Sequence, residues 1–404
     1  MTRSFDEERL LPPAQALERF FAGVAIADPP EERVSLTQAR ARVLACEVDA
    51  DAEYPSTRRS AMDGFAVAAA STPGRLRVTG DVRMGERFHG TVAAGEAVRI
   101  PTGGVIPQGA DAVVPIESAS VRNGTVCIEE PVIAGADVIE RGSDMRAGER
   151  LLRKGRRIGA PELAVLATLG VASVPVFARP IVSVISSGDE IVEPQQPLRG
   201  GEVRDANRYA LAAALESIGA RVRHTPIVRD VEGALEDALK EALDEGDAAV
   251  VTGGSSVGER DYTPAAVASL GEPGVVVHGL RVRPGRPTLL AAAGGKPIVG
   301  LPGNPLSALM MFETIGAPIV AALCGTQIAY DEIEARLEAA IAPRAGWTWY
   351  VPVALSQRGA QPLPLHSFAT SIAARASGYV VAERAFAAGE RVAVRRFLCG
   401  GARP

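Results

Sequence analysis

The segment 250–266, VVTGGSSVGERDYTPAA, concentrates glycine and serine between an apolar run and a helix-like stretch. Adjacent glycines allow positive φ angles and let backbone N–H groups approach an anion, while serine hydroxyls add further donors. The residues predicted to cradle a ligand in this way are Gly253, Gly254, Ser255 and Gly258. Asp261 would repel a phosphate unless a divalent cation lay between them, so the segment predicts a magnesium-bridged phosphate ester. The alternative is that Asp261 only caps the helix that follows.

Two more loops follow apolar strands in the same way. One is VISSGDE, residues 184–190, and the other lies within PIVGLPGNPLSALMMF, residues 297–312. Their candidate binding residues are Ser187, Glu190, Pro302, Asn304 and Pro305. Each loop has a simpler interpretation, namely a solvated loop in the first case and a stiff helix entry in the second. Because an open parallel sheet binds ligands at the carboxyl ends of its strands, three such loops favour one common site.

The composition restricts the class of protein. The chain has 404 residues and is 47% hydrophobic, so we expect several domains with real cores. Its 43 Lys and Arg stand against 48 Asp and Glu without a block of like charge, which argues against nucleic-acid binding. The four cysteines form no CxxC pair, which suits a reduced cytosol. We find no signal-peptide pattern and expect no segment as long as a membrane span, hence a soluble, cytoplasmic protein without a membrane partner.

The pattern of the sequence changes in blocks. Residues 10–48 predict helices, from the apolar spacing in AQALERFFAGV and in SLTQARARVLACEV. Residues 54–140 contain short apolar runs separated by turns, such as RLRVTG, AVRIPTGG, DAVVPIE and TVCIEE, which are typical of a β domain. GAPELAVLATLGVASVPVF then predicts a helix followed by a strand. WTWYVPVAL and GERVAVRRF predict a small β domain at the C-terminal end.

Residues 180–324 alternate between strand and helix patterns. IVSVISSG, RVRHTPIV and DAAVVTGG read as strands because they are short and rich in β-branched residues. ANRYALAAALESIGA, closed by Gly219, and DVEGALEDALKEALDEG read as amphipathic helices. The alternation predicts a doubly wound α/β domain with a parallel sheet.

Seven ordered stretches of the chain resemble the molybdopterin molybdenumtransferases, the MoeA and gephyrin E-domain family. They are SAMDGFAV, IPTGGVIPQGADAVVPIE, VIERGSDMRAG, VISSGDE, TGGSSVGERDYT, VRPGRPT and GLPGNPLSA. The resemblance covers nearly the whole chain. It implies an enzyme that uses Mg²⁺, inserts molybdate into adenylylated molybdopterin and releases AMP.

The resemblance also implies a multi-domain architecture of mixed α/β and β domains. The implied parts are a linker domain (1–51 with 141–178), an inserted β domain (52–140), an α/β molybdopterin-binding domain (179–326) and a small C-terminal β domain (327–404). Members of the family form elongated homodimers, with a cleft between the α/β domain of one subunit and the inserted β domain of the other. The adenylyltransferase that makes the adenylylated pterin is a candidate partner.

The resemblance assigns roles to five acidic or hydroxyl residues. Glu190 and Asp261 are the carboxylates expected nearest the magnesium, and Asp63 of MDGF completes the predicted catalytic set by holding metal or ordering water. Thr102 would donate to an oxyanion from a glycine-rich turn. Asp63 and Thr102 also fit plain β turns. Asp230 matches another acidic position of the family and is counted among the substrate-binding residues, although we prefer to interpret it as a helix N-cap.

The segment LRVRPGRP would supply positive charge, because molybdate is a dianion. Arg283 and Arg286 lie on a turn whose prolines restrict its motion. Relatives often have a lysine where this chain has Gly279, and Arg281 is the candidate replacement, although a guanidinium and an ammonium are not interchangeable. The simpler interpretation is a solvated basic turn.

The C-terminal part departs from the family pattern. GWTWYVPVAL stands where many relatives have an arginine. SFATSIAARASG still resembles the serine-rich stretch of the family, so Ser367 and Ser371 are predicted to reach the pterin end. Trp347 and Trp349 could stack on a planar ring, but filling the core of the small domain is the preferred interpretation.

Two other functions remain open from the sequence. The molybdopterin adenylyltransferase shares the glycine-serine loop on a similar α/β domain, but it usually lacks the parts that carry SAMDGF, PTGG and LRVRPGRP. A non-catalytic pterin-binding sensor or scaffold is the other alternative. Retention of Asp63, Glu190 and Asp261 together argues against that role.

Overall fold

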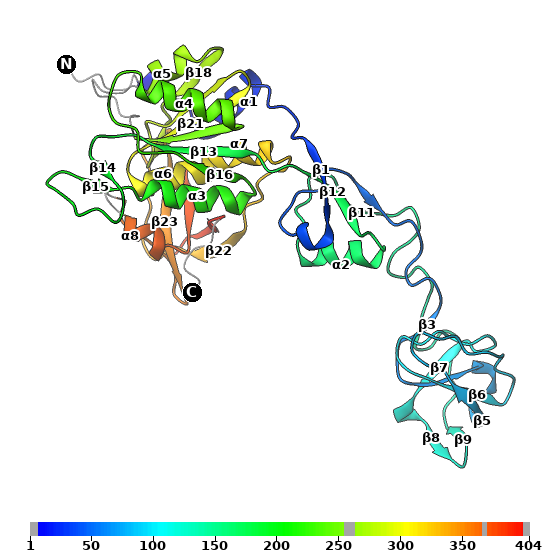
Figure 1. The fold of residues 1–404 in the computed structure, drawn as a ribbon. Coiled ribbons are helices and arrows are strands. Elements are labelled where there is room, and N and C mark those ends of the chain that lie inside the picture. The colour runs from blue at the N-terminus through cyan, green and yellow to red at the C-terminus, as the bar shows by residue number, and fades with distance from the viewer. Residues whose placement is uncertain (1–6, 254–262, 366–369, 399–404) are drawn as a thin grey trace. The chain divides into compact units, whose positions relative to one another are not determined.

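The chain divides into two compact units in a computed structural model (Figure 1). The residues that this structure describes are 7–253, 263–365 and 370–398. The first unit comprises Met1–Ala45, Gly155–Gly159 and Ser173–Pro404. The second unit comprises Cys46–Lys154 and Ala160–Ala172. The finer division into four domains stays a prediction.

A six-stranded sheet forms the centre of the first unit. Its strands are β13 (Ile181–Ser186), β16 (Arg221–His224), β17 (Ala248–Thr252), β18 (Pro273–His278), β20 (Leu289–Ala293) and β21 (Lys296–Leu301). They follow the order β16-β13-β17-β21-β20-β18, and the first four in this order are parallel. β20 is antiparallel to both of its neighbours, β21 and β18, so the predicted parallel sheet continues into an antiparallel edge. Only Gly294 and Gly295 separate β20 from β21, which is enough for a hairpin but not for a crossover.

Helices cover both faces of this sheet (Figure 1). They are α1 (Pro13–Gly23), α3 (Asn207–Ile218), α4 (Ala234–Glu245), α5 (Thr263–Ser269), α6 (Pro305–Met311) and α7 (Ala317–Leu323). On one face, α1, α3, α6 and α7 pack around a core that includes Val184 and Val250. On the other face, α4 and α5 pack around Ile185 and Val251. Successive residues of a strand point to opposite faces, so a strand covered on both sides is apolar throughout. The predicted doubly wound α/β class is confirmed.

α6 and α7 are parts of one continuous helix, Pro305–Leu323, joined by the π-helical turn η5 (Phe312–Gly316). By length and composition its 19 residues could cross a membrane, so the expectation that no segment reaches this length is wrong. In the structure, 72% of the 18-residue apolar stretch within this helix is buried inside the protein. The helix is apolar because it packs in the core of the α/β sheet, with Ala308 and Ile315 fully buried there.

The segment SLTQARARVLACEV, predicted to be helical, forms only a short 3-10 turn. This segment lies where the chain passes from the first unit into the second. Before this point come β1 (Glu31–Ser35) and η2 (Leu36–Gln38), and β12 (Ser173–Phe177) follows where the chain returns to the first unit. Ala41 adopts a positive φ of 62°, which ends any helix there. The N–H groups of Ala41 and Leu44 then donate to carbonyls within residues 156–158. Long-range backbone pairing therefore overrides the helical spacing, whereas the first predicted helix, α1, is confirmed.

A second six-stranded sheet is formed by β19 and by five strands that follow the long helix. Its strands are β19 (Val282–Arg283), β22 (Glu332–Arg336), β23 (Thr348–Ser356), β24 (Gly359–Pro362), β25 (Gly378–Ala382) and β26 (Arg391–Arg395). The order is β19-β23-β25-β26-β22, with β24 also paired to β23, and α8 (Thr370–Arg375) lies beside it. The predicted strands in WTWYVPVAL and GERVAVRRF are confirmed. β19 pairs Arg283 with Trp349, so the basic turn is tied to this C-terminal sheet.

The second unit is built on a separate β sheet. Its strands are β4 (Gly64–Val67), β5 (Gly74–Asp81), β6 (Glu96–Ile100), β7 (Ala112–Pro115), β8 (Ser120–Arg122) and β9 (Thr125–Ile128). They follow the order β7-β4-β6-β5-β9-β8. Phe65 and Val67 point into one buried cluster and Ala66 into another, as alternation along a strand requires. The β domain predicted from the turn-separated apolar runs is thus confirmed.

Short elements complete the second unit. They are β2 (Val48–Asp49) with β11 (Arg150–Leu152), β3 (Arg59–Ser60) with β10 (Val138–Ile139), the turns η3 (Ala69–Ser71) and η4 (Ile116–Ser118), and the helix α2 (Ala160–Thr168). α2 is the helix predicted in GAPELAVLATLG. In the sequence, α2 comes after β10 and β11, the strands that pair back with β3 and β2. It is followed by β12 of the first unit.

Glu313, in the π-helical turn η5, is a buried carboxylate of the first unit. It is only 3% exposed, and its Oε1 accepts the N–H of Leu398 at 2.8 Å. Burial raises its pKa to about 7, and the Leu398 bond opposes this rise only in part. The hydroxyl of Tyr330 donates to the Glu313 carbonyl at 2.8 Å, so the same residue anchors the segment before β22.

We expect Glu313→Gln to be more stable than the wild type at pH 8 and not at pH 4.5. A carboxyl whose folded pKa is raised contributes stability below its unfolded pKa, and that contribution is lost as pH rises through about 7. The corresponding difference is at most about 3 kcal/mol. Calorimetric melting temperatures of both proteins across this pH range measure it, with the exposed Glu334→Gln on β22 as control. Parallel pH profiles for the wild type and Glu313→Gln would contradict the expectation.

Candidate active site

The ends of β13, β17 and β21 lie side by side at the carboxyl edge of the α/β sheet. The parallel register pairs Ser186 with Thr252 and Thr252 with Leu301, which are the last residues of the three strands. The N–H of Ser187 donates to the Thr252 carbonyl at 2.9 Å and extends this alignment by one residue. The prediction that the three loops start from one edge of the sheet is confirmed, and their convergence on one ligand stays a prediction.

Gly253 begins the glycine-serine loop in a conformation that other residues cannot adopt without strain. Its φ is +88°, and a Cβ at this position would lie 2.0 Å from the carbonyl oxygen of Ser187. The backbone of one loop therefore passes directly against the next, which needs a glycine. The other residues predicted to act in this loop lie outside the described residues: Gly254, Ser255, Gly258 and Asp261.

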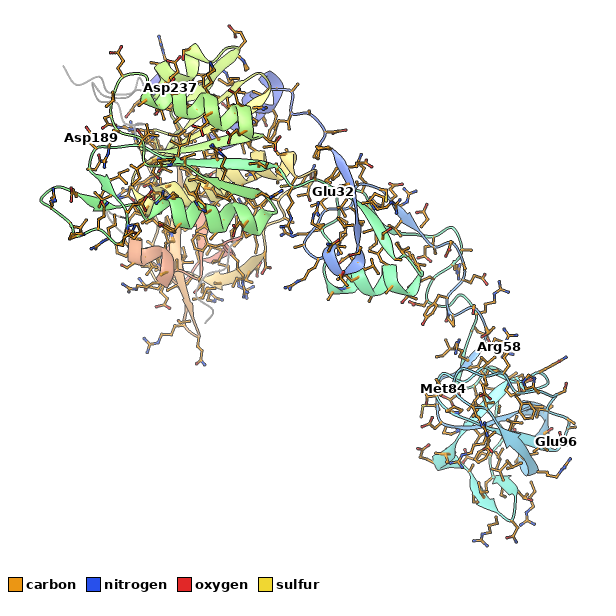
Figure 2. All side chains as sticks on the ribbon, viewed as in Figure 1. Glu32, Arg58, Met84, Glu96, Asp189 and Asp237 are labelled. Atoms are coloured by element: carbon orange, nitrogen blue, oxygen red, sulfur yellow. The ribbon has the colours of Figure 1, made fainter. Side chains whose placement is uncertain are left out.

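The loop after β13 carries two exposed carboxylates, of which Figure 2 labels Asp189. The backbone carbonyl of Glu190 accepts the N–H of Val203 at 2.8 Å, next to the short parallel pair β14 (Ile191–Val192) and β15 (Val203–Arg204). Among the described residues, none hydrogen-bonds to the Glu190 carboxylate. Its backbone is thus fixed while its carboxylate oxygens remain available to a ligand.

Asp230 lies beside this loop rather than at the start of a helix. Its N–H donates to Asp189 Oδ1 at 3.1 Å. Helix α4 starts at Ala234 with Gly233 at the N-cap, so the interpretation of Asp230 as the cap is wrong. The residues between Asp230 and α4 form a turn. The Asp230 backbone therefore lies against the β13 loop and not at the start of the helix.

The turn after β21 is a rigid helix entry. Pro302 is buried, Asn304 is the N-cap of α6 with its side-chain oxygen accepting the Ser307 N–H at 3.4 Å, and Pro305 is the first helical residue. The simpler interpretation of this loop, a stiff helix entry, therefore accounts for the amide of Asn304 and for Pro305. A Cβ on Gly303 would lie 3.7 Å from the Cα of Gly253, so this turn lies next to the start of the glycine-serine loop.

The three arginines of LRVRPGRP have different surroundings. The Nε of Arg281 donates to the Leu10 carbonyl at 2.7 Å, which fixes the chain just before α1. Arg283 is exposed, and its guanidinium lies 4.7 Å from the centre of the Trp349 ring and donates to the Leu365 carbonyl at 3.3 Å. Arg286 is exposed on the same turn. Arg283 and Arg286 are therefore exposed to solvent, whereas Arg281 is half-buried.

Asp63 and Thr102, in the second unit, are brought together by direct hydrogen bonds. The backbone N–H and the hydroxyl of Thr102 donate to Asp63 Oδ1 at 2.6 and 2.9 Å. These bonds lower the pKa of Asp63, the backbone bond most, so the exposed carboxylate stays ionised. The Oδ2 atom has no hydrogen bond to a described residue and remains available to another partner.

The chain is similar to proteins of one family along most of its length. The family profile of the MoeA N-terminal region (domain I and II) matches residues 11–170, and the profile named "Probable molybdopterin binding domain" matches residues 183–322. A molybdopterin molybdenumtransferase from a Nostoc species is 34% identical over 312 residues, which are 75% of this chain and 71% of that protein. One from Bacillus subtilis is 35% identical over 300 residues, 72% of this chain and 70% of its own length. The chain belongs to the molybdopterin molybdenumtransferase family.

Solved structures agree with this membership. A molybdopterin biosynthesis MoeA protein from Pyrococcus horikoshii superposes with a TM-score of 0.78 at 32% identity, over 96% of this chain and 99% of that one. A second structure from P. horikoshii OT3 has a TM-score of 0.85 at 24% identity, over 96% and 100%, and supports the fold. The molybdenumtransferases are transferases of molybdenum cofactor biosynthesis, and the predicted family and fold class are confirmed.

In this transferase the C-terminal tryptophans combine core packing with stacking. Trp349 packs against the core of the C-terminal sheet and also carries the Arg283 guanidinium on its ring. Trp347 lies under Arg344, 5.3 Å from the guanidinium carbon. Ser371 is exposed on α8, and Ser367 lies outside the described residues.

Sequence reasoning missed three residues that hold the loops of the molybdenumtransferase site. Arg229 donates to the carbonyls of Asp189 and Ile191 at 2.8 and 3.3 Å. Asn207 and Arg208 begin α3 and bond to the loops around them. The polar pair at the start of an otherwise apolar helix, in DANRYALAAAL, was the signal available in the sequence.

We expect Gly253→Ala to destabilise the transferase far more than Gly233→Ala. Both glycines have a positive φ, +88° and +81°, but a Cβ at Gly233 meets nothing within 4 Å. Gly233→Ala thus measures the left-handed strain alone, about 1 kcal/mol, while Gly253→Ala adds the clash with the Ser187 carbonyl. Melting temperatures of the two variants test this, and equal losses would show that the loop after β17 moves away at little cost.

Proposed function

We propose that this molybdenumtransferase inserts molybdate into adenylylated molybdopterin, in a reaction that requires Mg²⁺ and releases AMP. The observation that carries the proposal is the carboxyl edge of the α/β sheet, where β13, β17 and β21 end side by side and the segments that follow them begin with the exposed Glu190 carboxylate, Gly253 and the turn at Gly303. Backbone N–H groups on a glycine turn suit a phosphate, and a carboxylate next to them suits a bridging cation.

The residues present fit a magnesium ion at this edge. Mg²⁺ is commonly bound through one or two carboxylates together with substrate phosphates, and the Glu190 side chain offers one such carboxylate. Asp261 is the second carboxylate that we propose, from its place in the sequence. When bound, the metal would neutralise charge on the pyrophosphate oxygens during cleavage. Ser187 and Gly253 would contact the phosphate next to it.

Arg283 and Arg286 are the residues that we propose for the molybdate dianion. Arg283 is held by the Trp349 ring and by the Leu365 carbonyl, so its guanidinium is oriented before a ligand arrives. Arg281, with its Nε bonded to Leu10, keeps only its terminal N–H groups for this purpose. Of the three arginines predicted to bind the anion, Arg281 is therefore the weakest candidate.

Asp63 is proposed to act as an ionised carboxylate that holds a cation or orders the attacking oxygen. The two bonds from Thr102 keep it charged and fix its orientation, as either task requires. We also propose a homodimer, a cytoplasmic location and supply of the adenylylated pterin by the molybdopterin adenylyltransferase, as the family resemblance implies. Sedimentation of the purified protein tests the dimer.

The reaction is tested by chromatographic measurement of AMP released from adenylylated molybdopterin with molybdate and Mg²⁺. We expect release by the wild type that depends on both ions, and a decrease of more than about 10-fold in Glu190→Gln because the metal loses a ligand. Asp237→Asn, the same loss of charge on the exposed part of α4 (Figure 2), should leave release unchanged.

Two outcomes would contradict the proposal. Tight pterin binding without AMP release by the wild type would indicate a sensor or scaffold. AMP release that is equal with and without molybdate would indicate a pyrophosphate-cleaving activity of another kind.

A further inference from the structure

The first turn of α3 contacts the turn after β21 through one side chain. The Nδ2 of Asn207 donates to the carbonyl oxygen of Gly303 at 2.9 Å. A carbonyl only accepts hydrogen bonds, so the amide must present its NH₂ group to Gly303 and its Oδ1 must point elsewhere. The bond joins residues 96 apart in the sequence.

Asn207 is 7% exposed, and its Oδ1 has no hydrogen-bond partner among the described residues. An unpaired buried acceptor costs about 1–3 kcal/mol, so a small apolar side chain would pack here with less cost. The amide is therefore explained by the bond that it donates, not by packing. In the described part of the chain, the side-chain hydroxyls of Ser186 and Thr252, at this same edge of the sheet, are also buried without a hydrogen bond.

The next residue, Arg208, holds two further segments from the same helical turn. Its guanidinium pairs with Glu193, beyond the β13 loop, and donates to the Thr225 carbonyl, just after β16, at 3.2 Å. α3 itself is fixed by Leu211 and Leu215, which are fully buried against the sheet. One rigid turn therefore contacts the segments that follow β13, β16 and β21.

We propose that Asn207 is a positioning residue of the active site, which sets the Pro302–Pro305 turn through Gly303 and, through that turn, the start of the glycine-serine loop. A Cβ added at Gly303 would lie 3.7 Å from the Cα of Gly253, so the two backbones are neighbours and a shift of the turn changes the space beside the first residue of the loop. The catalytic consequence rests on the proposed function, whereas the structural consequence does not. A misplacement of about 1 Å at a reacting group costs on the order of 10²-fold in rate.

The experiment compares Asn207→Ala and Asn207→Asp with Ser217→Ala in the full-length protein. Ser217 lies at the other end of α3 and donates to the Ala214 carbonyl at 2.7 Å, so its variant also removes a side-chain hydrogen bond of this helix. Hydrogen exchange followed by mass spectrometry measures opening of the peptide 301–311. Steady-state AMP release measures kcat and KM for the adenylylated pterin.

We expect faster exchange in residues 301–311 for both Asn207 variants, and more in Asn207→Asp because a carboxylate repels the Gly303 carbonyl. We also expect kcat to fall by about 10–100-fold with KM changed less than about threefold. Ser217→Ala should match the wild type in both measurements. Exchange and kcat equal to those of Ser217→Ala, or losses that follow only the melting temperature, would overturn the proposal. If the wild type releases no AMP, the proposed function fails and the exchange result still decides the role of Asn207.

Discussion

The parallel register of β13, β17 and β21 is the constraint on which the site depends. It aligns Ser186, Thr252 and Leu301 at one edge, and the three loops of the candidate site on the α/β domain start from that alignment. The strands can lie this way because both faces of the sheet are covered by helices, so their apolar runs are buried throughout. The core and the site are therefore consequences of the same strand order.

Close backbone packing holds the starts of these loops near one another. Gly253 leaves no room for a Cβ beside the Ser187 carbonyl, and Gly303 lies next to Gly253 with space for a methyl group. Around them, Asn207 bonds to one loop and Arg229 to another. The side chains that could bind or react with a ligand remain exposed. The groups that hold these side chains in place are buried or bonded to the backbone. This arrangement suits a site that binds large, highly charged substrates on a fixed frame.

In the rest of the molecule, charged side chains are likewise either bonded within the fold or left exposed. Arg281 has its Nε bonded to the N-terminal segment, whereas Arg283 is placed on an aromatic ring and faces solvent. Asp63 is kept ionised by two donors from Thr102. Glu313, in contrast, is buried and has a raised pKa, which suits a junction inside the fold rather than a ligand site. Two residues of the same type can therefore differ in role. One has its charged group bonded or buried within the fold, and the other has its charged group exposed to a ligand.

The sequence by itself determined the family, the β domain and the order of strands and helices, because apolar periodicity and turn residues are local properties. It failed at residues 35–48, where positive φ at Ala41 and pairing with residues 156–158 override a helical pattern. Only the tertiary structure decided that Arg281 bonds to Leu10, 271 residues away, and that Asn207 bonds to Gly303. Such bonds depend on which backbone carbonyl a folded chain brings near, and no pattern of neighbouring residues encodes that distance.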